Sequence, residues 1–370
     1  MTAEPPACRL VPLSFADLAG WDADDHAAAL AAFRRGAAVL ADHPPKRRAL
    51  GTDAEALAAC LARAGAMPAD VDQPTARAFF EREFRPFEVL PDGGAGFFTG
   101  YYEPVVDGAR RRSARFPVPL YRTPDDLVEI DPDTPPAGID KGTRFARSGA
   151  DGVTPYPDRA AIEAGCLAGR GLELVHLADP VDAFFVHIQG AARIRLAEGG
   201  AMRVTYAAKS GHPYTPIGRV LIETGALPKG GATMASIRAW LTAHPAEAAG
   251  VMSRNRSFIF FREAPVEDPL LGPVAAAKVP LTAGRSLAVD RLIHSFHTPV
   301  WVEARLPGVA GGGVWNRLMV AHDTGSAIVG PARGDVFFGS GDAAGAVAGA
   351  MQASGRFVVL LPRDTGGRDA

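Results

Sequence analysis

Apolar residues recur three and four positions apart through the first quarter of the chain. This spacing places them on one face of a helix, and the alanine and leucine that dominate these stretches are good helix formers. The pattern predicts three helices, at residues 24–40, 53–66 and 75–84.

The pattern changes at Pro91, where short apolar runs begin to alternate with Gly, Pro, Asp and Asn. Such runs are typical of strands joined by turns in barrels or sandwiches. We expect strands at 117–123, 183–196, 202–208, 257–261, 300–306, 317–323 and 356–362. Alternation within 183–196 puts Phe185, His187 and Gln189 on one face of a strand.

The remaining segments predict two helices and three irregular stretches. The helices are expected at 216–223 and at 233–249, where Ser236 is a candidate cap. The proline-rich stretch 123–138 predicts a surface loop, 307–313 predicts a loop tip, and the tail after Arg363 is expected to be disordered.

Composition and charge restrict the class of protein. The chain has 370 residues, of which 47% are hydrophobic and 22% charged, as in a globular protein of two or three domains. A net charge of -2 disfavours a nucleic-acid binder, since the arginines at 110–112 and 115 are offset by nearby acids. No apolar run approaches a membrane span, and the first ten residues lack the basic and apolar regions of a secretory signal.

Cysteine and histidine usage argues against a metal or a covalent thiol mechanism. The three cysteines form neither a disulfide framework nor a CxxC pair. Cys60 is expected to be a buried small hydrophobe, and Cys166 has no activating base nearby. His294 and His297 lack a third ligand at the usual spacing. With no Walker loop, strict GxGxxG or GxSxG motif, we expect no metal and no cofactor.

Three acids beside glycines are the strongest candidates for chemistry. Asp323 ends an apolar run, Asp335 opens another, and Asp342 follows shortly after. Carboxylates at strand ends can share a cleft, where burial or a like charge raises one pKa and creates a proton donor near neutral pH. Glycosidic bond cleavage needs such a donor. The alternative is that these aspartates simply cap turns.

Polar and aromatic residues in three further clusters could bind a ligand. Tyr101 and Tyr102 would face opposite sides of a strand, so one of them could pack on a sugar ring. Glu103 is either an acid or a turn residue. The other candidates are Gln189 with Gly190, and Lys209 with Tyr214.

In this order, these clusters resemble the membrane-bound lytic murein transglycosylase A family. The resemblance rests on FTGYYEP at 98–104, HIQGAARIRL at 187–196, GHPYTPIGR at 211–219, NRSFIFF at 255–261, VPLTAGRSLAVDR at 279–291 and DTGSAIVGPARGDVFFGSGDAAG at 323–345. RAFFEREFRPFEV at 77–89 also resembles the family. The likeness covers roughly residues 77–362.

The resemblance implies a fold that is mainly β with some α. It implies a double-psi β-barrel catalytic domain made of residues 1–104 and 266–370, with the N-terminal helices included. A smaller β-domain, residues 105–265, would be inserted into it and would line the glycan groove.

The resemblance also implies an activity and its residues. Asp335 maps to the catalytic aspartate and Asp323 to the second motif aspartate. The positions expected to bind substrate are Thr99, Gly100, Tyr101, Tyr102, Gln189, Gly190, Lys209, Tyr214 and Asp342. The expected reaction breaks the β-1,4 bond between N-acetylmuramic acid and N-acetylglucosamine in peptidoglycan and leaves a 1,6-anhydro end.

Two other functions remain open from the sequence. One is a glycoside hydrolase that uses Asp323 and Asp335 as a pair, and the other is a glycan-binding module without activity. We expect a monomer that binds peptidoglycan and proteins of the cell-wall machinery. We do not expect it to bind nucleic acid. The substrate, rather than any targeting segment, implies a periplasmic location with outer-membrane association.

Overall fold

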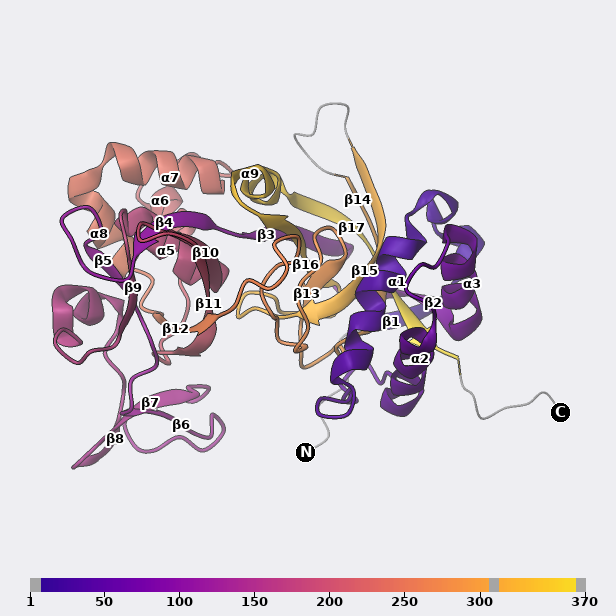
Figure 1. Ribbon diagram of the computed structural model, residues 1–370, viewed down its shortest axis with the longest axis horizontal. Helices are drawn as coiled ribbons and strands as arrows, with labels where there is room; N and C mark the ends of the chain where they lie inside the picture. The colour runs from indigo at the N-terminus through magenta and orange to yellow at the C-terminus, as the bar shows by residue number, and fades with distance from the viewer. Residues whose placement is uncertain (1–7, 306–312, 364–370) are drawn as a thin grey trace. The chain divides into compact units, whose positions relative to one another are not determined.

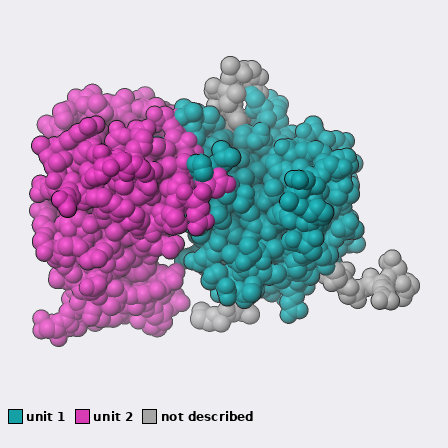
Figure 2. Space-filling view, viewed as in Figure 1, with its two compact units in different colours: residues 1–102, 269–339, 343–370 teal, residues 103–268, 340–342 magenta. Residues whose placement is uncertain are grey.

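The computed structural model describes residues 8–305 and 313–363. The chain forms two compact units, coloured separately in Figure 2. Unit 1 contains Met1–Tyr102, Pro269–Gly339 and Ala343–Ala370, and unit 2 contains Glu103–Asp268 and Ser340–Asp342. The loop predicted at 307–313, apart from Gly313, and the predicted disordered tail lie outside the described residues. The fold is mainly β with some helices, as expected.

Unit 1 is built on a sheet with the strand order β1-β2-β17-β14-β15-β13-β16-β3, in which β17 also pairs with β3 (Figure 1). Its strands are β1 Cys8–Pro12, β2 Phe84–Pro91, β3 Gly96–Glu103, β13 Ser286–Val289, β14 Pro299–Arg305, β15 Val314–Asp323, β16 Arg333–Ser340 and β17 Gln352–Pro362. Strands β13 and β15 are parallel, whereas the pairs β1–β2, β2–β17, β17–β14, β17–β3, β14–β15 and β13–β16 are antiparallel. The long apolar runs at 300–306, 317–323 and 356–362 are therefore neighbouring strands.

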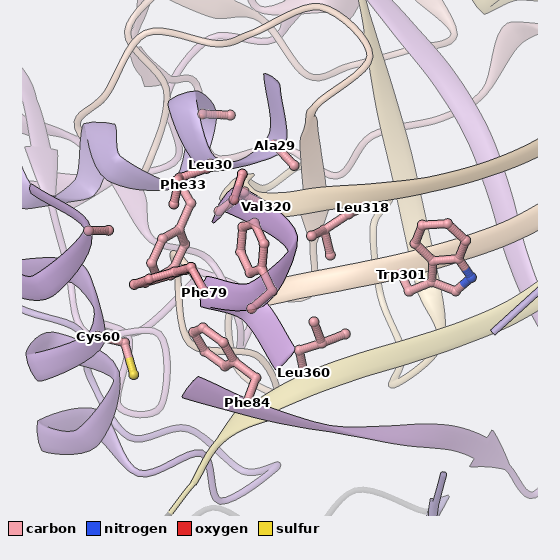
Figure 3. Close-up of a cluster of buried hydrophobic side chains, with 14 of the residues drawn as sticks. Ala29, Leu30, Phe33, Cys60, Phe79, Phe84, Trp301, Leu318, Val320 and Leu360 are labelled. Atoms are coloured by element: carbon pink, nitrogen blue, oxygen red, sulfur yellow. The ribbon is translucent and has the colours of Figure 1, made fainter. Parts of the chain in front are cut away.

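Strand β14 shows why both faces of this sheet are buried. Trp301 points to one face, where it meets Leu318 of β15 and the N-terminal helices (Figure 3). Val300 and Val302 point to the other face, against Phe357 and other apolar residues of the sheet. Because side chains alternate along a strand, a continuous apolar run is what two covered faces require.

The N-terminal helices cover one face of the sheet. They are α1 His26–Phe33, α2 Ala54–Ala66 and α3 Gln73–Glu83, with short 3-10 turns at Phe15–Asp17, Trp21–Ala23 and Arg34–Val39. The carboxylates of Asp25, Asp53 and Asp72 accept hydrogen bonds from the first backbone N–H groups of these helices, which begin there for that reason. The three predicted helices are confirmed, although 34–39 is tighter than α and Phe84 already belongs to β2. One further helix, α9 Asp342–Ala350, precedes β17.

Unit 2 has a six-stranded sheet and a separate three-stranded sheet. The first has the order β12-β11-β10-β4-β9-β5, and the second has the order β6-β7-β8. The strands are β4 Val105–Ala109, β5 Val118–Tyr121, β6 Leu127–Glu129, β7 Phe145–Gly149, β8 Gly152–Thr154, β9 Glu173–Leu177, β10 Ala191–Leu196, β11 Ala201–Lys209 and β12 Ile259–Ala264. The helices are α4 Arg159–Ala161, continued by a π turn at Ile162–Cys166, then α5 Pro180–Gln189, α6 Ile217–Glu223, α7 Met234–Ala243 and α8 Pro245–Ser253.

The strand predicted over 183–196 is wrong in its first half, which forms helix α5. Asp179 accepts a hydrogen bond from Val181 N at 2.7 Å, Pro180 occupies the first turn, and Gly190 ends the helix with a φ of 78°. These are start and stop signals of a helix, and they outweigh the short alternation of Phe185, His187 and Gln189. Only β10 is a strand.

The helix predicted over 233–249 is two helices. α7 ends at its C-cap His244, and Pro245 is the first residue of α8. Thr233, not Ser236, is the N-cap of α7. Ser236 occupies the third helical position and its hydroxyl accepts a hydrogen bond from Thr233 N at 2.9 Å. No helix in the described part of the chain is long and apolar enough to cross a bilayer.

Candidate active site

Asp323 and Asp335 lie in one row across three neighbouring strands of unit 1. Asp323 ends β15, Asp335 lies near the start of β16, and β13 pairs with both strands. Ala288 of β13 is the register partner of both aspartates. Two strand spacings separate their Cα atoms by roughly 10 Å. The β13–β15 register shifts just before Ala288, and the shared side of the two carboxylates is shown by Tyr101 and Thr99, which lie two residues apart on β3 and bond to them. Sheet pairing therefore gathers two carboxylates that a loop separates along the chain.

Asp335 has the environment of a proton donor. Its carboxylate is partly buried, and burial raises its pKa to about 6, with a smaller increase from the negative charge of Asp323. The Thr99 hydroxyl donates a hydrogen bond to Asp335 Oδ1, and this bond and the charge of Arg333 oppose the increase. With this pKa about a tenth of the molecules are protonated at pH 7, far more than for a free carboxyl group, and the proton can be released readily.

Asp323 is held by donors on both oxygens. Tyr101 Oη donates to Oδ2 at 2.9 Å, and the backbone N–H of Ala276 donates to Oδ1 at 3.3 Å. Burial raises the pKa of Asp323, while these donors and Thr324 N–H oppose the increase. Because bonds to both oxygens favour the charged form, we take Asp323 as the ionised member of a coupled pair.

Strand β3 supplies the residues facing these carboxylates. Thr99 and Tyr101 lie on one face, and the Tyr101 ring lies 5.3 Å from that of Phe337 between centroids. Tyr102 faces the opposite side, as alternation predicts, and is buried against Gly345 of α9. A Cβ at Gly100 would come within 2.8 Å of Ala348 Cα, so this glycine permits close approach of α9.

The histidines and cysteines considered from the sequence have shifted pKa values that leave the imidazoles neutral and the thiols protonated. His294 Nε2 contacts Pro331 O at 2.8 Å, and burial lowers the pKa of both His294 and His297 to about 4. Burial raises the pKa of Cys60 to about 11 and also raises that of Cys166. No group of three or more His, Cys, Asp or Glu within the described ranges could hold a metal ion.

A hollow of about 600 Å³ in unit 1 lies elsewhere. It is lined by Arg9 and by residues 88–91, 94–96 and 354–357, and none of the candidate residues borders it. It contains no pair of carboxylates with a raised pKa, so we locate the site by its chemistry and not by this hollow.

Comparison with known proteins identifies the family. The model of the MltA specific insert domain matches residues 97–262, and that of the 3D domain matches residues 285–361. The crystal structure of membrane-bound lytic murein transglycosylase from Agrobacterium tumefaciens is 45% identical, covers 96% of this chain and 98% of that chain, and gives a TM-score of 0.88. This chain belongs to the membrane-bound lytic murein transglycosylase A family.

Other members of the family are also similar. MltA from Neisseria gonorrhoeae is 33% identical, covers 100% of this chain and 98% of that chain, and has a TM-score of 0.80. Escherichia coli MltA with bound chitohexaose is 30% identical, covers 80% and 79%, and has a TM-score of 0.62. The curated Escherichia coli (strain K12) membrane-bound lytic murein transglycosylase A is 34% identical over 273 residues, 71% of this chain. The match spans 65% of that relative's length.

The other residues expected from the lytic murein transglycosylase A resemblance belong to unit 2, and all but Tyr214 lie at the ends of helices or strands. Gln189 is the last residue of α5, Gly190 its C-cap, and Lys209 the last residue of β11. Tyr214 is 38% exposed in the loop before α6, and Asp342 opens α9. These five do not form part of the carboxylate row of unit 1.

Glu103, considered as an acid from the sequence, is a buried structural carboxylate in unit 2. Arg193 Nη2 and Arg203 Nη2 each donate to its Oε2 at 3.1 Å, and the Ser340 hydroxyl donates to the same oxygen at 2.6 Å. Two guanidinium groups and a hydroxyl hold its oxygens, so we assign Glu103 a structural role in unit 2. These hydrogen bonds offset the free-energy cost of burying the Glu103 side chain.

Arg333 was missed by sequence reasoning. It stands two positions before Asp335 on β16, so both side chains share a face. Its Nη2 donates to Thr99 Oγ1 at 2.6 Å. The i, i+2 spacing from a candidate acid was the available signal.

Proposed function

We propose that this protein is a peptidoglycan lytic transglycosylase. It breaks the β-1,4 bond between N-acetylmuramic acid and N-acetylglucosamine and leaves a 1,6-anhydromuramoyl end. The observation that carries the proposal is the partly buried Asp335 carboxyl with a pKa of about 6, in a chain that is 45% identical to a lytic murein transglycosylase along almost the whole length of both.

Asp335 acts first as the general acid. Its proton moves to the glycosidic oxygen while the bond from that oxygen to C1 of the muramoyl residue breaks, and the electron pair stays on the oxygen. Positive charge develops at C1, and the substrate's own acetamido group can stabilise it. The N-acetylglucosamine side leaves with a hydroxyl group.

Asp335 then acts as the general base. Its carboxylate takes the proton from the muramoyl C6 hydroxyl as that oxygen bonds to C1, which closes the anhydro ring and regenerates the acid. No water is consumed. One carboxyl group suffices because the nucleophile is tethered to the reacting sugar and its effective concentration is high.

Asp323 tunes Asp335 without taking part in proton transfer. Its negative charge raises the pKa of Asp335, and its own oxygens are held by Tyr101 and Ala276 N–H. A neighbouring charge of this kind keeps the acid protonated until the leaving oxygen needs it.

We propose that glycan also contacts residues outside the carboxylate row, which lie at the ends of strands and helices and in a loop. Tyr214 offers an aromatic face to a sugar, Lys209 a cation to a stem carboxylate, and Gln189 an amide. Gly190 and Asp342 complete the proposed set, and the bound chitohexaose in Escherichia coli MltA supports glycan binding. Gly100 and Tyr102 would act by holding the Thr99–Tyr101 face of β3 in position.

The domain assignment and the finer fold are proposals as well. We assign catalysis to a domain of residues 1–104 and 266–370, and glycan contacts to an inserted domain of residues 105–265; the two compact units support this division. Pairing of β17 with both β14 and β3 supports a double-psi β-barrel in the first domain.

The same substrate sets the proposed location and partners. Peptidoglycan implies the periplasm, and the relatives' name, membrane-bound lytic murein transglycosylase A, supports association with a membrane. We propose that this membrane is the outer membrane. We propose a monomer that acts alongside cell-wall machinery proteins.

The decisive experiment is mass spectrometry of muropeptides released from purified sacculi by the wild type and by Asp335→Asn. We expect 1,6-anhydromuropeptides from the wild type and a loss of at least about 100-fold in the variant, the lower range of what a general acid contributes. Asp70→Asn, at an exposed aspartate of unit 1 outside the carboxylate row, serves as the matched control because it makes the same carboxylate-to-amide change.

Two other results would replace the proposal. Reducing-end products would indicate a glycoside hydrolase with a second working carboxylate. Binding to sacculi without products from either protein would indicate a glycan-binding module.

A further inference from the structure

Arg333 has an arrangement that the proposed reaction does not use. Its side chain is partly buried, with Nη2 on Thr99 Oγ1 at 2.6 Å, Nη1 on the backbone oxygen of Gly334, and the guanidinium carbon 5.3 Å from the centroid of the Phe97 ring. Within the described part of the chain it forms no ion pair with a carboxylate, although Asp335 lies two residues away on the same face of β16.

The contact with Thr99 determines where the hydroxyl proton points. A guanidinium group has only donors, so Thr99 Oγ1 must accept from Arg333 and must place its own single proton elsewhere. The acceptor it finds is Asp335 Oδ1. Arg333, Thr99 and Asp335 therefore form a one-way chain of donors that ends on one particular oxygen.

Because Oδ1 of Asp335 is occupied as an acceptor, the proton of the neutral carboxyl group belongs on Oδ2. We propose, on the basis of the function proposed above, that Arg333 is a positioning residue that acts through Thr99 to fix Oδ2 as the oxygen of Asp335 that exchanges protons with the glycan. Without Arg333 the Thr99 hydroxyl could turn and accept a proton from Oδ1, and the carboxyl group would present the wrong oxygen.

The proton balance of the reaction follows from this arrangement. Oδ2 gives its proton to the glycosidic oxygen as the C1–O bond breaks, and Oδ2 then receives the proton of the C6 hydroxyl as that oxygen bonds to C1. Between these steps Asp335 is negatively charged, and the Thr99 hydroxyl and the guanidinium group stabilise that charge. The same oxygen serves both steps, so the carboxyl group need not rotate.

The charged and titratable groups around Asp335 come from three strands. Arg333 on its own strand lowers the pKa of Asp335, and Asp323 on β15 raises it. Tyr101 on β3 is titratable, but its pKa is raised well above 10 by burial and by the nearby carboxylates, so it stays neutral. The β13 residue in register is Ala288, which carries no charge.

The test is a double-mutant cycle on kcat with Arg333→Met, Thr99→Val and both together, each measured across pH on purified glycan strands. We expect each single change to lower the pH-independent kcat roughly tenfold, part of the contribution of a positioned acid. The double variant should be no slower than Thr99→Val, because Arg333 acts through Thr99. If kcat of the double variant fell by the product of the two single losses, the proposal would be overturned.

The pH profile supplies a readout that a merely structural role would not move. Loss of either group removes an influence that lowers the pKa of Asp335, so the high-pH fall of kcat should move to higher pH. An unchanged fall in both single variants would contradict the proposal. Arg291→Met, at an exposed arginine of the same unit, is the control for loss of a guanidinium group and should leave kcat and the profile unchanged.

Two further variants keep the test decisive if Arg333→Met does not fold, as judged by its thermal melt. Thr99→Ser keeps the hydroxyl and should restore kcat to within about twofold of wild type, whereas Thr99→Val should not. Equal kcat for these two variants would overturn the proposal. Asp335→Asn distinguishes failure of the proposed function from failure of the role of Arg333. Activity in that variant would overturn the proposed function. An inactive variant, together with multiplied losses of kcat in the cycle, would overturn only the role of Arg333.

Discussion

At the scale of single residues, the pKa of Asp335 results from burial and from neighbouring groups that act in opposite directions. Burial and the charge of Asp323 favour the neutral carboxyl, while the Thr99 hydroxyl and Arg333 favour the carboxylate. A pKa of about 6 lies between a free carboxyl and a fully buried one. Such a group holds its proton at the start of the reaction and can still release it.

This balance predicts the pH dependence of activity. Asp335 must be protonated to act as the acid, so kcat/KM should fall about tenfold per pH unit above its pKa of about 6. Asp323→Asn removes the negative charge that raises this pKa, so the fall should begin at lower pH. A kcat/KM profile of both proteins on glycan strands measures the shift.

The control for this prediction is a carboxylate of the same unit outside the row. Asp53→Asn alters the cap of α2 and should leave the profile in place. A fall that moves to higher pH in Asp323→Asn, or that does not move, would contradict the assigned charge of Asp323.

At the scale of elements, the carboxylate row depends on how three strands are paired. β13 runs parallel to β15 and antiparallel to β16, and Ala288 is opposite both aspartates. Of these three strands, β15 rests on the N-terminal helices, whose aromatic residues also pack against β14 and β17 (Figure 3). Phe33 of α1 is at the centre of this packing, with its ring centroid 5.7 to 6.0 Å from those of Phe79, Phe80 and Phe84.

We therefore expect Phe33→Ala to lower the free energy of unfolding by about 3–5 kcal/mol, because it removes a fully buried ring and leaves a cavity. Leu270→Ala, at a side chain that is 86% exposed, should change it by less than about 0.5 kcal/mol. Urea unfolding followed by circular dichroism measures both. Equal effects of the two changes would mean that α1 does not stabilise the sheet.

At the scale of the whole molecule, each unit has its own buried apolar clusters. Unit 1 has one cluster between helices and sheet and another on the opposite face, and the clusters of unit 2 lie around its six-stranded sheet and helices α5 to α8. The chain enters unit 2 at Glu103 and leaves it at Asp268 as one continuous segment, with only Ser340–Asp342 added from elsewhere.

A fragment of residues 103–268 should therefore fold by itself. We expect a β-rich circular dichroism spectrum, cooperative unfolding and no release of muropeptides, since the fragment carries neither Asp323 nor Asp335. A destabilised but folded fragment would fit the loss of the Ser340 bond to Glu103. A fragment without cooperative unfolding would show that its clusters need the rest of the chain.

The sequence by itself determined the local features of this protein. Alanine-rich periodicity and capping aspartates specify the N-terminal helices, continuous apolar runs specify the strands of unit 1, and strand alternation separates Tyr101 from Tyr102. The residue types in the motif at 323–345 were enough to make Asp323 and Asp335 candidate site residues. Where two local signals competed, as at 180–190, alternation misled and the caps of α5 decided.

Only the tertiary structure decided which of these residues act together. The row of Asp323, Ala288 and Asp335 depends on the pairing of strands distant along the chain, and no local pattern encodes that register. The chain from Arg333 through Thr99 to Asp335 likewise joins β16 to β3. Burial sets the proton affinity of Asp335, and burial is a property of the packed molecule, whereas helix caps and strand alternation depend on neighbouring residues alone.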